Sequence, residues 1–148
     1  VKDIAVDTPK AGFVDVWVQS HLHEVAPQSL LNAVNVALDP NSRRPYTDKV
    51  SVKSALPYEF SISATLVLFP GPDANVVEET ARTALQKYIE MVNSLGYDVT
   101  RSALFAALHQ GGVQNVIITQ PAKDIILNQS RYAKNVCVYL NITEFRDV

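Results

Sequence analysis

The chain contains a single cysteine, Cys137, so no disulfide can form within it, which fits a reducing compartment such as a cytoplasm. It has no basic excess either: 13 Lys and Arg stand against 15 Asp and Glu, and Arg43-Arg44 is the one adjacent basic pair. Because nucleic-acid binding depends on Lys and Arg contacts to phosphates, we expect no nucleic-acid partner. No apolar run reaches the ~18 residues that a membrane-spanning helix needs, so we also expect no membrane partner.

The overall composition of the chain is that of a folded globular protein. Of its 148 residues, 47% are hydrophobic and 19% are charged. A chain of this length can bury about 70% of the surface that its unfolded form exposes, so it can fold without metals or disulfides. No basic-then-apolar leader opens the chain, and its first residue is Val1 rather than Met. We therefore expect it to be a fragment of a longer protein.

The first third of the chain predicts a small α+β unit. Phe13–Val18 alternates apolar and other residues with period two, which is typical of a strand, and residues 4–6 can form a short partner strand. Residues 27–38 have apolar residues at helical spacing after Pro27, and residues 39–42 end this helix. A strand is predicted for residues 49–55, with Val50 and Val52 facing inward.

The remaining two thirds predict a second α+β unit after a break at Pro57. A strand is predicted for residues 58–69, where apolar and polar residues alternate as far as Leu66, which indicates one buried and one wet face, as in an antiparallel sheet. A long helix is predicted from Asp73, as its N-cap, to Leu95, with Gly96 as the stop. A shorter helix capped by Thr100 follows at residues 101–109, and then strands at residues 113–119 and 135–143.

This pattern predicts the α+β class, as two small helix-on-sheet units with mostly antiparallel strands. The predicted boundaries are residues 1–56 for the N-terminal unit and residues 57–148 for the C-terminal unit.

One cluster has residue types that bind metals: His21, His23 and Glu24. On a strand the two histidines would point the same way and could share a metal ion. Zinc sites use three or four protein ligands, however, and this segment follows a strand directly and is typical of a polar loop. We predict a solvated loop and no metal site, and keep a metal-dependent hydrolase as an alternative.

Other candidate catalytic groups are poorly placed. Ser102 and His109 lie seven helical positions apart, about 10 Å, so they cannot form a nucleophile–base pair with each other. Cys137 has no base near it in sequence and is expected on the less buried side of its strand. The Phe69–Asp73 turn before a helix resembles an anion site, but it lacks the Lys and glycines of a phosphate loop. We therefore predict neither an enzyme nor a cofactor.

Two aromatic side chains and several turns are the candidates for a structural role. Trp17 and Tyr139 face away from the apolar stripes of their strands, which favours either a protein–protein contact or a sheet covered on both sides within the chain. Arg43 and Arg44 are further interface candidates. Candidate structural corners, which would fix how the two units are oriented, are Pro45, Pro70, Gly71, Pro72 and Asp73.

An ordered set of motifs resembles the baseplate J-like proteins of phage tails. The resemblance covers nearly the whole chain and rests on the order and spacing of segments that are weak individually. These segments are Arg44–Asp48, Val50–Val52, Pro57-Tyr58, Phe69–Asp73, Asp98–His109, Gly112–Gln114 and Pro121–Asp124.

The resemblance implies a structural component of the baseplate wedge of a contractile tail, in a phage, a prophage or a tail-like particle. It implies partners among other baseplate and tail proteins, several copies in a six-fold assembly, synthesis in the bacterial cytoplasm and no catalytic residues. Members of the family are longer, so this chain corresponds to their C-terminal portion. Besides the hydrolase, a small-molecule-sensing α+β module is kept as an alternative.

Overall fold

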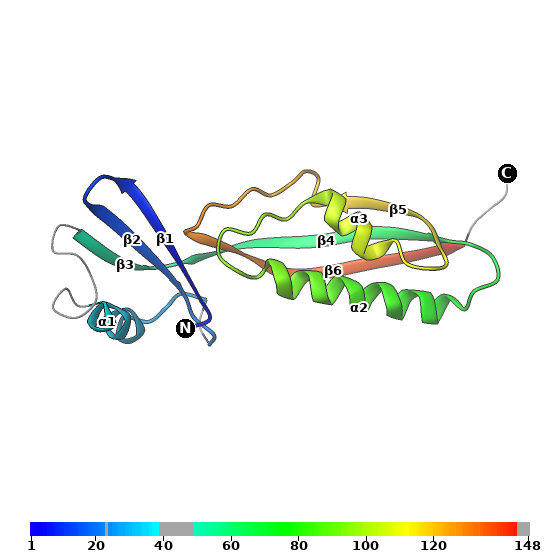
Figure 1. The fold of residues 1–148 in the computed structure, drawn as a ribbon. Helices are drawn as coiled ribbons and strands as arrows, with labels where there is room; N and C mark the ends of the chain where they lie inside the picture. Colours follow the sequence, from blue (N-terminus) through cyan, green and yellow to red (C-terminus); the bar gives the residue numbers. More distant parts are fainter. Residues whose placement is uncertain (23, 39–48, 145–148) are drawn as a thin grey trace. The chain divides into compact units, whose positions relative to one another are not determined.

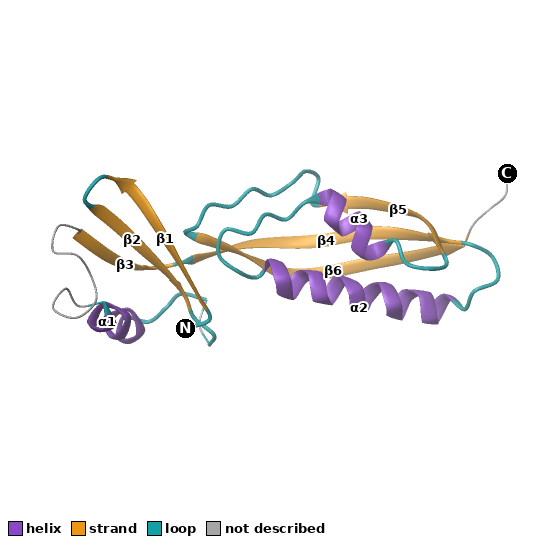
Figure 2. Ribbon diagram, viewed as in Figure 1, coloured by secondary structure: helices purple, strands orange, loops and turns teal. Residues whose placement is uncertain are grey.

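The computed structural model describes residues 1–22, 24–38 and 49–144, which form three helices and two three-stranded sheets (Figure 2). No helix among these residues is both long and apolar enough to cross a membrane. In chain order the elements are β1 Asp3–Lys10, β2 Phe13–Gln19, α1 Gln28–Ala37, β3 Lys49–Ser54, β4 Leu56–Leu68, α2 Ala74–Val92, α3 Arg101–Leu108, β5 Val113–Gln120 and β6 Arg131–Glu144.

The chain divides into two compact units that are not simple consecutive halves. The first unit contains residues 1–58 together with the short segments 94–97 and 127–132, and the second contains residues 59–93, 98–126 and 133–148. Two later segments thus belong to the first unit besides its N-terminal residues. The predicted division into linear domains, residues 1–56 and 57–148, stays a prediction.

The first unit is a three-stranded sheet, in the order β1-β2-β3, with α1 on one face (Figure 1). β1 and β2 are antiparallel, and β2 and β3 are parallel because the connection through α1 returns the chain to the same end of the sheet. Val16 and Val18 of β2 pack with Ala26 and with Val34 of α1. Val50 and Val52 pack against this cluster, as predicted.

The opposite face of this sheet is covered by the two returning segments. Trp17 is partly buried there against a cluster of Ala55, Leu95 and Tyr132. The Tyr132 hydroxyl donates a hydrogen bond of 2.7 Å to the backbone carbonyl of Glu24, and burial raises the pKa of this phenol. Trp17 therefore packs within the chain, the second of the two positions expected for it.

The second unit places α2 and α3 on one face of a sheet in the order β5-β4-β6 (Figure 1). The even-numbered residues of β4 from Phe60 to Leu68 are buried, as their alternation predicts. Facing them, α2 buries the stripe Val77, Ala81, Leu85, Tyr88 and Val92, and α3 buries Leu104 and Leu108.

The α+β class is confirmed, and both sheets are mixed. Antiparallel pairing joins β1 to β2 and β4 to β5. The crossover through α1 makes β2 and β3 parallel, and in Figure 1 β6 runs in the same direction as β4.

Some element boundaries differ from the predicted ones. Pro57 lies inside β4 rather than before it, at the second position of the strand, where Leu56 N–H donates to the carbonyl of Ser130. A proline is tolerated near the start of a strand because few ladder bonds are lost there. The helix α2 ends at Val92, with Asn93 as its C-cap, three residues before the predicted end at Leu95.

Candidate functional site

Arg101 connects the start of α3 to the end of β5 through hydrogen bonds. Its Nη2 donates a hydrogen bond of 3.0 Å to the carbonyl of Ile118, and its Nη1 donates to the carbonyl of Pro121. Its backbone N–H donates to Oδ1 of Asp124 at 2.7 Å, and the ring of Phe105 lies 5.6 Å from its guanidinium carbon. Arg101, Pro121 and Asp124 all belong to the motifs that carry the family resemblance, and here their contacts join two segments of backbone.

Asp73 begins α2 as the sequence predicts. Its carboxylate accepts a hydrogen bond of 2.9 Å from the backbone N–H of Asn75, which satisfies one of the free donors at the helix start. The preceding turn contains Gly71 with φ of +110°, a conformation that glycine adopts readily, between the exposed Pro70 and Pro72. The turn occupies the predicted corner between β4 and α2.

Gly112 contacts both ends of this turn between β4 and α2. Its carbonyl accepts a hydrogen bond of 2.9 Å from Phe69 N–H. Its φ is +93°, and a Cβ at this position would lie 2.7 Å from Cγ2 of Val77 and 3.4 Å from Cβ of Pro72. Only glycine fits such a close approach. That the corner is stiff stays a prediction, and the other candidates Arg43, Arg44 and Pro45 lie outside the described residues.

The candidate metal-binding residues fall in the segment after β2. His21 and Glu24 are exposed, and His23 lies outside the described residues. Among the residues that the structure describes, no three His, Cys, Asp or Glu side chains are grouped closely enough to hold a metal ion.

The α3 candidates belong to the helix ends, and Cys137 to an exposed strand. Thr100 caps α3 by accepting a hydrogen bond of 3.4 Å from Ala103 N–H, and His109 is its C-cap, as expected. Ser102 and Cys137 are both exposed.

The outer face of the second unit's sheet carries no charged side chain among its central positions. The side chains at these central positions alternate along each strand with side chains that face the helices. Ile117 and Tyr139 are the largest of them, 48% and 62% exposed. The helix side differs, because α2 exposes Glu79, Arg82 and Lys87. Charged residues are depleted at the centres of protein–protein interfaces, so this face is a candidate contact surface. Its residues are Ser61, Ser63, Thr65, Val67, Asn115, Ile117, Thr119, Cys137, Tyr139 and Asn141.

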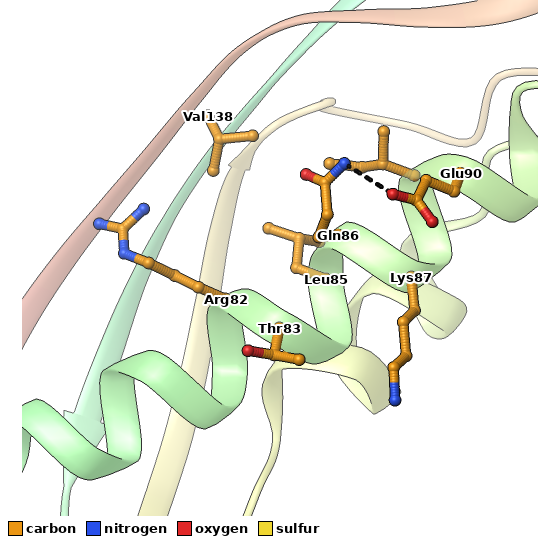
Figure 3. Close-up of a pocket in the computed structure, with 8 residues that line it drawn as sticks. Arg82, Thr83, Leu85, Gln86, Lys87, Glu90 and Val138 are labelled. Atoms are coloured by element: carbon orange, nitrogen blue, oxygen red, sulfur yellow. Dashed lines mark hydrogen bonds between the residues drawn. The ribbon is translucent and has the colours of Figure 1, made fainter.

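An open groove of about 440 Å³ separates α2 from β6 (Figure 3). Leu85 and Ile89 of α2 and Val138 of β6 supply its apolar lining. Gln86 lies at its rim, where Nε2 donates a hydrogen bond of 3.4 Å to Oε1 of Glu90. Its polar lining comes from Arg82, Thr83, Gln86, Lys87 and Glu90, all on α2.

The two predicted interface aromatics belong to different units: Trp17 is partly buried within the first, and Tyr139 is exposed in the second. Their roles in contacts with partners stay predictions. The sequence analysis missed the contacts of Arg101. One signal was available, because a cation at the first position of a helix is unfavourable with the helix dipole and so indicates a specific bond elsewhere.

Comparison with known proteins connects these features to one family. Residues 60–134, just over half of the chain, match the Baseplate J-like protein C-terminal domain. The chain is also 40% identical over 132 residues to a protein named Baseplate protein J from Escherichia phage P2. This match covers 88% of the chain but only 44% of the phage protein. The chain therefore belongs to the baseplate J-like family, and its residues 60–134 match the C-terminal domain of that family.

Proposed function

We propose that the chain is a structural part of the baseplate of a contractile phage tail and acts by binding other proteins. The observation that carries this proposal is the family membership, together with the similarity to a baseplate protein over 88% of the chain. The structure is consistent with it, because the motif residues Arg101, Pro121, Asp124 and Gly112 join segments of the fold.

The finer parts of the proposal concern partners, copies and location. The partners are other baseplate and tail proteins, and the uncharged sheet face is the surface that suits such contacts. Several copies stand in a six-fold arrangement, as the symmetry of a tail requires. The protein acts without catalysis, nucleic acid or membrane, and it is made in the bacterial cytoplasm before it enters the particle.

The test uses the full-length protein in the phage or prophage that encodes it. The coding segment for residues 1–148 is deleted in frame, and particles are examined by electron microscopy after induction. We expect tails without baseplates, or no tails, and restoration when the intact gene is supplied separately. Normal tails of normal infectivity in the deletion mutant would refute the proposal.

No specific observation favours either of the two alternative functions, the small-molecule-sensing module or the metal-dependent hydrolase. A sensing module would bind a small molecule, and the groove at α2 is open rather than enclosing (Figure 3). Metal analysis of the purified protein tests the hydrolase alternative, because stoichiometric zinc or manganese would support it.

A further inference from the structure

One face of the first unit's sheet is covered by a helix over only part of its width. α1 packs against β3, and Val16 and Val18 of β2 are buried with α1 in one cluster. On the neighbouring strand β1, Ile4 and Val6 lie directly opposite Val18 and Val16, so their side chains are on the same face as α1. Ile4 and Val6 are nevertheless 46% and 55% exposed. The β1 side of this face is therefore apolar and open.

The burial along β1 is the reverse of what its residue types predict. Ala5, with its small side chain, is partly buried against the cluster on the other face, whereas the larger Ile4 and Val6 are exposed. Burial of large apolar side chains is a main source of stability, so two successive exposed ones on a strand point to a missing cover. α1 contains no charged residue, and its Val36 is also exposed. The cover is therefore expected to be apolar.

The second unit shows which kind of element covers such a sheet. Its sheet also has three strands, and two helices, α2 and α3, lie on one face (Figure 1). α3 packs against the edge strand β5, whose Val116 and Ile118 are buried. A helix is about 10 Å across and strands lie about 4.8 Å apart, so one helix covers about two strands. Among its described residues the first unit has one helix for three strands, and β1 is the strand left uncovered.

The rest of the full-length protein is the source of a second helix. The phage P2 relative is matched over only 44% of its length, and the domain that residues 60–134 match is the C-terminal one of the family. Chain that precedes this part joins β1 at its start, where Asp3 lies opposite Gln19 at the end of β2. A helix antiparallel to β1 would reach this point through a short turn, since connections from a helix to a strand usually have about 2–6 residues. Such a helix would lie over Ile4 and Val6.

We infer that a helix from the segment of the full-length protein before residue 1 packs over β1, beside α1, and completes this face of the sheet. The helix is amphipathic, with apolar residues at spacings of three and four directed at Ile4 and Val6. About ten residues suffice, because they form a helix about 15 Å long. The inference goes beyond the proposed function, since it concerns the fold of the full-length protein and does not depend on a role in the baseplate.

Hydrogen exchange of the purified full-length protein, measured by mass spectrometry, tests this packing. Val6→Lys is compared with the matched control Met91→Lys on α2, at side chains 55% and 54% exposed. In the unmodified protein, a stretch before residue 1 should be protected. A lysine at position 6 would place a charge beneath the helix, so the amides of this stretch should exchange at least about tenfold faster in Val6→Lys and be unchanged in Met91→Lys.

Peptides that cover residues 13–19 provide the internal control. They should keep their protection in Val6→Lys, because β2 is buried by α1 and by its neighbouring strands rather than by the inferred helix. The inference is overturned if no stretch before residue 1 is protected, or if this stretch exchanges at the same rate in Val6→Lys and Met91→Lys. Neither result bears on the baseplate role, which the deletion mutant tests separately.

Photo-cross-linking identifies what covers β1. Ile4→p-benzoylphenylalanine keeps an apolar side chain on the open face, and the purified full-length protein is irradiated at low concentration. A product of monomer mass, cross-linked to the segment before residue 1, supports the inference. A product of twice that mass, as a second copy would give, contradicts it, and so does a cross-link to any other segment or none at all.

Discussion

Replacing Gly112 by alanine should destabilise the second unit strongly, while the same change at Gly111 should not. Gly112 has φ of +93°, whereas Gly111 lacks a positive φ, and a Cβ there would meet nothing within 4 Å. The two glycines are adjacent, so the pair differs in backbone conformation and in contacts but not in location.

The magnitude has two parts. A left-handed backbone conformation disfavours a residue with a Cβ by about 1–2 kcal/mol. The new methyl group would lie 2.7 Å from Cγ2 of Val77, a buried side chain of α2, so the helix or the corner must shift, which adds about 1–3 kcal/mol. The sum of about 2–5 kcal/mol corresponds to a fall in Tm of roughly 5–15 °C for a chain of this size.

The assay is thermal and urea unfolding of both variants, followed by circular dichroism. Gly111→Ala should unfold within about 1 kcal/mol of the unmodified protein, and it can be slightly more stable because alanine restricts the unfolded chain. If Gly112→Ala unfolds at the same temperature as Gly111→Ala, the close approach of Gly112 to Val77 and Pro72 is not what stabilises this corner.

Three further predictions concern single contacts. Arg101→Met should lower the free energy of unfolding by about 2–4 kcal/mol in urea titrations, because two backbone carbonyls lose a charged donor, and Arg101→Lys should lose less since one bond can form again. Asp73→Ala should lower it by about 1 kcal/mol through loss of the N-cap, whereas Asp73→Asn should leave it nearly unchanged. Tyr132→Phe should cost about 1 kcal/mol near neutral pH. Because the pKa of Tyr132 is raised in the folded state, its contribution is complete below pH ~10 and is lost at higher pH, so the variant should show a weaker alkaline decline in Tm.

The sequence predicts best where one interaction decides the local structure. The alternation in β4 and the stripe of α2 are confirmed because burial of one face fixes both patterns. Asp73 and Thr100 are confirmed as N-caps because each bonds to a backbone N–H two or three residues away.

Contacts between distant segments were beyond the reach of such patterns. Arg101 bonds to carbonyls 17 and 20 residues away, and the segment around Leu95 covers a face of the first sheet. A carbonyl carries no side-chain signature, so nothing in the local sequence marks it as the acceptor for a distant arginine. The groove at α2 was missed for the same reason, because Val138 comes from a strand about 50 residues later than the helix.

The way the chain passes between its two units has a consequence for dissecting the protein. It crosses from one unit to the other five times, after residues 58, 93, 97, 126 and 132. Expressing residues 59–148 alone would leave segments 94–97 and 127–132 without the sheet that they cover, and would expose Leu95 and Tyr132 to water. A protease that cuts once, after residue 58, would leave the two fragments held by noncovalent contacts within the first unit, such as the bond from Asp3 to Leu95 N–H. The nicked protein should therefore elute as one particle and separate only in denaturant.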